Sequence, residues 1–208
     1  NIGNSTFSGC GSLTSVTIGN NVTSIGISAF EKCRSLTSIF IPNSVMKIGE
    51  YAFYNCNCLT SIVIPDKITS IGRNMFRGCS SLISVTIPNS VTEIGRMAFS
   101  DCINLTSIAI PNSVITIGDY AFQSCSSLTS VAIGNSVKTI GERAFLRCDA
   151  LISIDVDAAN THYCSIDGVL FNYAKDTLIQ YPASNTRTEY TIPNSVTTLG
   201  YSAFRECS

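Results

Sequence analysis

The chain has 208 residues and a formal net charge of −1, from 13 Lys and Arg residues against 14 Asp and Glu residues. A surface with so few basic residues does not attract phosphate backbones, which argues against a nucleic-acid partner. No apolar run approaches the roughly 18 to 20 residues of a membrane helix, and the first residues lack the basic and apolar regions of a signal peptide.

A repeat of 23 residues organises the sequence. Phenylalanine recurs at this spacing, and a cysteine follows each phenylalanine within its unit. The pairs are Phe7 and Cys10, Phe30 and Cys33, Phe53 and Cys56, Phe76 and Cys79, Phe99 and Cys102, Phe122 and Cys125, Phe145 and Cys148, and Phe204 and Cys207. Self-similarity at a fixed period in this range is typical of a solenoid, in which each unit packs against its neighbours.

We therefore expect one repeat domain over residues 1–208, with regular repeats over 1–157. Residues 1–10 begin inside a repeat, and Ser208 directly follows a repeat cysteine. Solenoids normally close with polar capping units, and neither end of the sequence resembles one. We expect the chain to be a segment of a longer protein.

Taken in chain order, each unit begins with a short strand. In the unit from Leu36 to Cys56, the segment Leu36–Ile41 alternates apolar with small polar residues and is rich in β-branched types. This pattern predicts a strand with Leu36, Ile39 and Ile41 toward the core. Pro42-Asn43 then ends the strand by its turn chemistry.

The second part of the unit contains an apolar pair, Val45 and Ile48, followed by a glycine that recurs in every unit as Gly49 does here. A glycine at a fixed place indicates a backbone angle or a close approach that a Cβ would block. After it, the apolar spacing in Glu50–Cys56 suits a turn or two of helix or 3₁₀ helix on the outer side.

The period breaks once, between residues 158 and 193, where no Phe-Cys pair occurs. Gly168–Asn172 and Thr177–Tyr181 are joined by the polar segment Tyr173–Asp176, which predicts a β-hairpin. We expect one irregular coil with a protruding hairpin over 158–193 and a last repeat over 194–208.

The sequence from Ile110 to Val131, IPNSVITIGDYAFQSCSSLTSV, strongly resembles the leucine-rich repeats of the BspA-like type, also called the Treponema pallidum class. The segment Tyr163–Phe171, YCSIDGVLF, is similar to an insert that many members of this family carry. The resemblance covers essentially the whole chain.

The resemblance implies a right-handed leucine-rich-repeat solenoid with a parallel sheet, an α/β repeat solenoid rich in β structure. It also implies a cell-surface or secreted protein of a host-associated microbe, in a family associated with virulence and with adhesion to host proteins such as fibronectin and fibrinogen. The family is defined by its core columns, so this inference about function is an analogy at the level of the fold.

Eight of the cysteines occupy one repeat column, which favours a column of buried thiols. Side chains stacked at a strand spacing of about 4.8 Å lie farther apart than a disulfide allows, and a straight ladder spreads potential metal ligands instead of converging them. Disulfides and metal remain the alternatives. We expect Cys58 and Cys164, which lie outside the column, to be the exposed thiols.

His162 is the only histidine, and it lies near Cys164, Asp157 and Asp167 in the sequence. A Cys-His-Asp arrangement can form a nucleophile with its base. A solvated histidine on a loop is the simpler interpretation, and we predict no catalytic site, no metal and no cofactor.

The outward side of the strands is the surface most suited to a partner, because its side chains are small and weakly charged. Phe40 and Val63 interrupt it as an apolar pair. The candidate contact residues on this face are Ser38, Phe40, Ser61, Val63, Ser84, Thr86 and Ser107. Alternatively, the recurring serine serves only sheet packing.

The hairpin is a second candidate contact, with Tyr173, Lys175 and Tyr181, since loops on rigid scaffolds often carry function. Longer and charged side chains gather on the turn side of the units, where we predict a solvated outer face. They are Glu50, Tyr51, Arg73, Arg77, Arg96, Asp119, Tyr120, Glu142, Arg143 and Arg147.

These observations favour a non-catalytic protein-binding or adhesion module whose partners are host extracellular-matrix or surface proteins. The alternative is an architectural spacer that displays another domain and has no ligand of its own.

Overall fold

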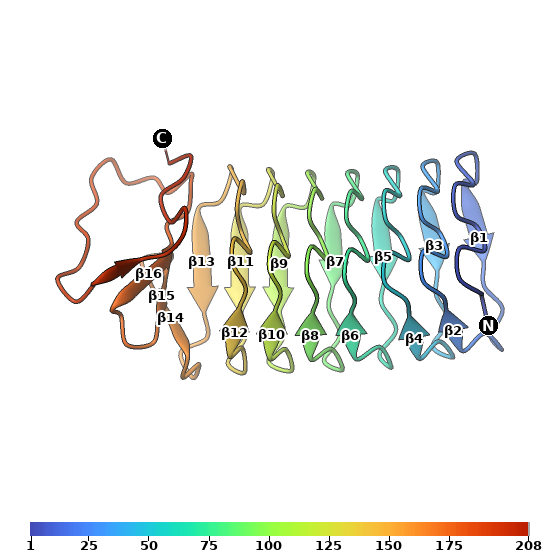
Figure 1. Ribbon diagram of the computed structural model, residues 1–208, viewed down its shortest axis with the longest axis horizontal. Helices are drawn as coiled ribbons and strands as arrows, with labels where there is room; N and C mark the ends of the chain where they lie inside the picture. Colours follow the sequence, from blue (N-terminus) through green and yellow to red (C-terminus); the bar gives the residue numbers. More distant parts are fainter. Residues whose placement is uncertain (208) are drawn as a thin grey trace.

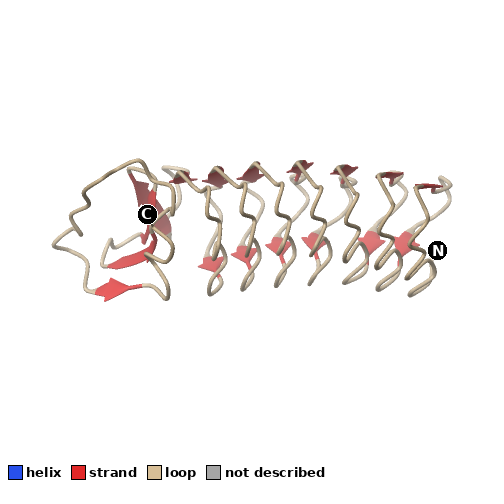
Figure 2. Cartoon of the chain, turned by 90° about the horizontal axis from the view of Figure 1, so that it is seen from above, coloured by secondary structure: helices blue, strands red, loops and turns tan. Residues whose placement is uncertain are grey.

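The computed structural model describes residues 1–207, which form an elongated solenoid whose coils stack along the long axis (Figure 1). Each repeat makes one coil, so residues one period apart lie side by side in neighbouring coils. The predicted solenoid with parallel strands is confirmed. Two rows of strands run along it, separated by loops (Figure 2).

The first row, the wide ladder, contains one strand from each regular coil. Its strands are β1 (Ser15–Thr17), β3 (Ser38–Phe40), β5 (Ser61–Val63), β7 (Ser84–Thr86), β9 (Ser107–Ile110), β11 (Ser130–Ile133) and β13 (Ser153–Val156). The pairing is parallel, with Ser15 opposite Ser38 and Ser130 opposite Ser153. Alternation in the sequence places Ile39 of β3 in the core and its two neighbours outside.

The second row, the narrow ladder, was not predicted as strands. Its members are β2 (Ser24–Ile25), β4 (Lys47–Ile48), β6 (Ser70–Ile71), β8 (Glu93–Ile94), β10 (Thr116–Ile117) and β12 (Thr139–Ile140). The sequence shows only one inward isoleucine in each, too little for an alternating pattern. The ladder pairs β2 with β4 and then β6 through β12, all parallel.

The predicted helix on the turn side is wrong, because no residue of 1–207 lies in an α-helix or 3₁₀ helix. Each turn segment contains two residues with positive φ, such as Tyr51 (58°) and Asn55 (57°), which a right-handed helix does not allow. Hydrogen bonds also leave the coil: Phe53 N–H donates to the Met75 carbonyl (3.0 Å), and Asn55 N–H donates to the Arg77 carbonyl (2.8 Å).

The recurring glycine is explained by close approach between coils. A Cβ built on Gly118 would lie 2.6 Å from the backbone nitrogen of Arg96. Positive φ plays no part at this position. Of the two reasons that the sequence left open, the structure supports the close approach.

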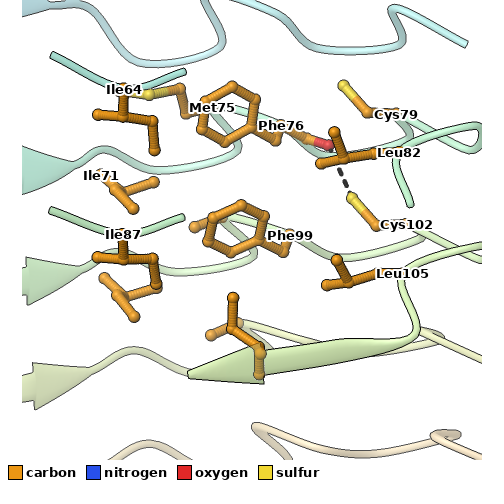
Figure 3. Packing of buried hydrophobic residues seen from close by; sticks show 14 of the residues in the cluster. Ile64, Ile71, Met75, Phe76, Cys79, Leu82, Ile87, Phe99, Cys102 and Leu105 are labelled. Carbon is orange, nitrogen blue, oxygen red and sulfur yellow. Dashed lines mark hydrogen bonds between the residues drawn. The ribbon is translucent and has the colours of Figure 1, made fainter. Parts of the chain in front are cut away.

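Phenylalanine rings form the spine of the core (Figure 3). Neighbouring rings in the series from Phe7 to Phe145 are stacked with centroids 5.1 to 5.6 Å apart, within the favourable range for aromatic pairs. Phe99, in the middle, is fully buried. Each ring therefore depends on the coil before it and the coil after it.

The irregular coil carries the predicted hairpin and one additional strand. The hairpin consists of β15 (Val169–Asn172) and β16 (Thr177–Gln180), and β14 (Tyr163–Ile166) pairs antiparallel with β15. The last repeat adds β17 (Thr198–Leu199), parallel to β16.

The strands of this hairpin are packed, and its tip is exposed. Val169, Phe171 and Leu178 are fully buried and form a second hydrophobic cluster with Tyr181 and Ala203. The last repeat packs over these apolar side chains and covers them. The hairpin thus extends the end of the solenoid and exposes only the turn at residues 173–175.

Candidate partner-binding surface

The outward columns of the wide ladder are exposed as predicted. Ser38, Ser61, Ser84, Ser107 and Thr86 are all open to solvent, while the residues between them point into the core. Because these side chains are short, the face is flat. Asp155 of β13 is the only ionisable residue in its outward columns over residues 15–155, and Ser153 Oγ donates to its carboxylate (2.9 Å).

Phe40 and Val63 form an exposed apolar pair on this face. Phe40 is 66% exposed and Val63 is 73% exposed. They occupy the same column in adjacent coils, where Thr60 N–H donates to the Thr37 carbonyl (3.3 Å). Thr17 and Thr86 occupy the column on either side of the pair, so its apolar character is local.

The hairpin residues divide into two groups. Tyr173 and Lys175 are exposed at the tip, as a contact role requires. Tyr181 is only 6% exposed, and its ring stacks on Phe204 with centroids 5.2 Å apart. The expectation that Tyr181 offers a contact surface is wrong, because its ring takes the place of a core phenylalanine.

The cysteine column is a series of buried thiols that act as hydrogen-bond donors. All ten cysteines are free. In each coil from Cys33 to Cys148, the thiol donates to the carbonyl oxygen of the phenylalanine in the preceding coil, at 3.1 to 3.2 Å. Burial raises the pKa of the Cys79 and Cys148 thiols to about 12. Thiols that stay protonated are poor nucleophiles.

Three other cysteines, Cys10 at the start of the column and Cys58 and Cys164 outside it, are not fully buried. Cys10 is exposed, contrary to the expected buried column, because a coil lies on only one side of it. Cys58 is exposed as expected. Cys164 is half-buried and donates to the Asn172 carbonyl (3.4 Å), so it is less open than the sequence suggested.

His162 does not form a catalytic arrangement. Its Nδ1 pairs with Thr161 Oγ1 (3.1 Å), whereas Asp167 forms an ion pair with Arg187 (2.8 Å). Within residues 1–207, no three His, Cys, Asp or Glu side chains converge as metal ligands.

The turn side is exposed at Arg73 and Arg96, as predicted, and these arginines lie over tyrosine rings of adjacent coils. Arg73 lies 6.0 Å from the ring centre of Tyr51, and Arg96 lies 5.7 Å from that of Tyr120. Arg143 also contacts Tyr120, through a hydrogen bond from Nη1 to the phenol oxygen (2.6 Å). The signal available in the sequence was the placement of arginine and tyrosine at nearly the repeat spacing, which puts them in adjacent coils.

Comparison with protein families gives a match to the BspA-type leucine-rich repeat region, with six copies, over residues 1–108, 46–177 and 181–208. The chain belongs to the BspA-type leucine-rich repeat family. The resemblance found in the sequence is thereby confirmed. A comparison with curated protein sequences gave no significant match.

Solved structures of bacterial leucine-rich repeat proteins share the fold. A leucine-rich repeat protein of Eubacterium ventriosum is 27% identical over 94% of this chain, with a TM-score of 0.69. The T. pallidum leucine-rich repeat protein is 36% identical over 72% of this chain and 70% of its own length, with a TM-score of 0.68. A leucine-rich cell surface protein of Faecalibacterium prausnitzii is 28% identical over 92% of this chain and 66% of its own, with a TM-score of 0.67.

The BspA-type chain spans 45% of the E. ventriosum protein. Within residues 1–207, no helix has the length and apolar character to cross a membrane.

Proposed function

We propose that this BspA-type chain is a non-catalytic protein-binding or adhesion module of a cell-surface or secreted protein. The observation that carries the proposal is the flat, exposed face of the wide ladder with the apolar pair Phe40 and Val63 at its surface. Adjacent exposed apolar side chains rimmed by polar residues are typical of protein contact sites.

The chemistry of this face favours a protein partner. Exposed Ser38, Ser61 and Ser84 offer hydroxyl donors and acceptors at a regular spacing, one from each coil. With little charge on the face, recognition would depend on shape, hydrogen bonds and the apolar pair. The hairpin tip, with Tyr173 and Lys175, is the second candidate contact.

The cellular location is part of the proposal. The F. prausnitzii relative is described as a cell surface protein, and a surface location would bring the wide ladder to host extracellular-matrix or surface proteins. The raised pKa of the buried thiols and the dispersed ionisable groups around His162 support a non-catalytic role.

A binding assay with paired variants tests the proposal. Fibronectin and fibrinogen are immobilised, and retention of the chain is measured by surface plasmon resonance. The test variant is Phe40→Thr with Val63→Thr, which restores the residue found in the same column at Thr86. Loss of this pair should weaken retention at least tenfold, because central apolar contacts dominate interface energies.

The matched control removes two exposed apolar residues that directly precede strands of the narrow ladder. Met46→Thr with Ile115→Thr makes the same kind of change in a column that otherwise contains Thr69 and Thr92. Binding should survive this change. If the unmodified chain passes freely over both proteins, or if the two variants bind equally well, the proposed face is rejected and the spacer role is favoured instead.

A further inference from the structure

A cavity of about 190 Å³ lies on the turn side where the regular coils meet the last repeat. Its walls are the segment from Ile140 to Phe145 on one side and Ile179, Gln180, Gly200 and Tyr201 on the other. The irregular coil separates these segments in sequence, and the fold brings them together at the end of the molecule beyond β12 (Figure 1).

A shortened turn creates this cavity. Tyr181 N–H donates to the Ala203 carbonyl (2.8 Å), as Phe122 N–H donates to Ala144, so Tyr181 takes the phenylalanine place in its coil. Likewise, Gly200 N–H donates to the Leu178 carbonyl (2.7 Å), so Leu178 takes the place of the narrow-ladder isoleucine.

Between these two places the irregular coil has only Ile179 and Gln180. A regular coil has four residues there, from Gly118 to Ala121 between Ile117 and Phe122. In the regular array, residues of this segment present carbonyl groups to the preceding coil, as Glu142 and Ala144 do.

The preceding coil therefore has backbone donors without acceptors. In the regular array, Tyr120 N–H donates to Glu142 (3.0 Å) and Phe122 N–H donates to Ala144 (2.8 Å). The equivalent N–H groups one coil later, those of Arg143 and Phe145, have no hydrogen-bond acceptor within residues 1–207. Phe145 is buried. A buried N–H without a partner destabilises the folded protein, so an acceptor bound in the cavity would be stabilising.

Arg143 adds a fixed positive charge to the same wall. Its guanidinium carbon lies 3.8 Å from the ring centre of Tyr201, and its Nη1 donates to the Tyr120 phenol oxygen (2.6 Å). These contacts on both sides hold the side chain in place. Its Nε is buried and has no partner in the described part of the chain.

We propose that this junction cavity binds a single carboxylate group. Arg143 and Phe145 both line it. Their backbone N–H groups and the buried Nε of Arg143 have no partner within residues 1–207, and a guanidinium pairs well with a planar carboxylate. The volume exceeds the roughly 30 Å³ of one water and is smaller than the roughly 300 Å³ at which pockets for drug-sized ligands begin. One guanidinium beside the exposed Glu142 suits a monoanion better than a doubly charged phosphate.

The carboxylate has two possible sources, a free small acid or an acidic side chain of a partner. Acetate is the probe for the first, and N-acetylglutamate N-methylamide is the probe for the second. Acetamide, which has the shape of acetate without its charge, is the control ligand. Binding of acetate alone identifies a free acid as the ligand, and equal binding of both probes identifies a peptide side chain as able to reach the site.

Amide chemical shifts measured by NMR during titration test the proposal. The Arg143 and Phe145 N–H signals should move downfield and saturate with acetate, with a dissociation constant on the order of millimolar for so small a ligand. Acetamide should leave them in place. Glu142→Gln, which removes the carboxylate at the rim, should tighten binding by about two- to tenfold by removing repulsion between like charges.

Arg143→Gln should weaken acetate binding at least tenfold. The matched control is Arg77→Gln, which removes an arginine that also lies over a tyrosine, Tyr54, but whose Nε is already paired with the Asp101 carboxylate (3.1 Å). If neither the unmodified chain nor Glu142→Gln shows saturable shifts with acetate, or if acetamide produces the same shifts, the cavity holds only water. The face with Phe40 and Val63 is separate, so failure here leaves the adhesion proposal unaffected.

Discussion

The thiol of Cys102 donates a hydrogen bond to the carbonyl oxygen of Phe76, 3.2 Å away in the preceding coil (Figure 3). The same carbonyl accepts the N–H of Cys79 (3.1 Å), so both of its lone pairs are used. Each buried cysteine therefore links the backbone of one coil to the next while filling space in the core. This double role explains why the column contains cysteine and not alanine or valine.

Replacing Cys102 by alanine should lower the free energy of unfolding by about 1–3 kcal/mol, because a buried side chain and its hydrogen bond are both lost. Urea denaturation followed by circular dichroism measures the change. Cys58→Ala is the control, since this exposed thiol should contribute no more than about 0.5 kcal/mol. Equal effects from the two substitutions would contradict the linking role of the buried column.

The buried thiols should also make the protein less stable at alkaline pH. Burial raises the pKa of Cys33 to about 11 and that of Cys79 and Cys148 to about 12. An unfolded thiol loses its proton near pH 8.5. Below that pH both states are protonated and the stability is fully present. Above it the unfolded state gives up protons that the folded state keeps, so unfolding becomes more favourable until the folded pKa is reached.

Above pH 8.5 the expected slope is about 1.4 kcal/mol per pH unit for each deeply buried thiol, such as Cys79 and Cys148, and it is smaller for Cys33, which lies nearer the end of the column. Urea midpoints measured between pH 7 and pH 10.5 give this slope. Cys79→Ala should reduce the slope, since burial raises the pKa of this thiol. A stability that stays constant over this pH range would mean that solvent reaches the column.

Removing a ring from the aromatic spine should be more damaging than removing a thiol. Phe99 stacks between Phe76 (5.3 Å) and Phe122 (5.4 Å), and it is fully buried. Phe99→Ala should cost about 3–5 kcal/mol through the cavity that it leaves. Phe40→Ala removes the same atoms from a side chain that is mostly exposed, so its melting temperature should stay close to that of the parent chain. If the two variants melt together, the spine is not a stacked core.

The spacing of the repeat was enough to predict the wide ladder, because each core column has one kind of residue at one period. It did not predict the narrow ladder. It was not enough for the turn side. The positions of Ala52, Phe53 and Cys56 resemble those on a helix, but positive φ at Tyr51 and Asn55 turns the chain twice. A tyrosine in the sequence does not indicate a backbone with positive φ.

Two sequence signals in the irregular coil indicate features beyond the predicted hairpin. Asp167 (φ 55°) and Gly168 (φ 80°) form the tight turn between β14 and β15, and an Asp-Gly pair between apolar segments is typical of such turns. Tyr181 stands 23 residues before Phe204, the spacing of a core aromatic residue. The exposure of Phe40 and Val63, in contrast, follows directly from alternation along a strand.

The junction cavity could not have been predicted from the sequence. It depends on a turn that is two residues shorter than its regular counterpart and on hydrogen bonds between residues far apart in the sequence. Arg143 has the same repeat position as Tyr120, and the sequence placed both on the solvated outer face.

The close approach of the coils at the glycine column leads to a last test, with a control from the same column. A Cβ at Gly118 would lie 2.6 Å from Arg96 N and 2.8 Å from the carbonyl carbon of Gly95. At Gly72 the nearest atom is the side-chain Cγ of Glu50 at 3.5 Å, an ordinary contact. The coils are more open there, where β4 and β6 do not pair.

Gly118→Ala should therefore lower the free energy of unfolding by about 1–3 kcal/mol, since the backbone of the preceding coil at Gly95 and Arg96 must move to make room for a methyl group. Gly72→Ala should be neutral or should raise stability by about 0.4–1 kcal/mol, because alanine restricts the unfolded chain more than glycine does. Neither glycine has positive φ, so the difference between the two variants isolates the contact between coils. Thermal denaturation of both variants measures it, and equal melting temperatures would show that the glycine column is not required for close stacking.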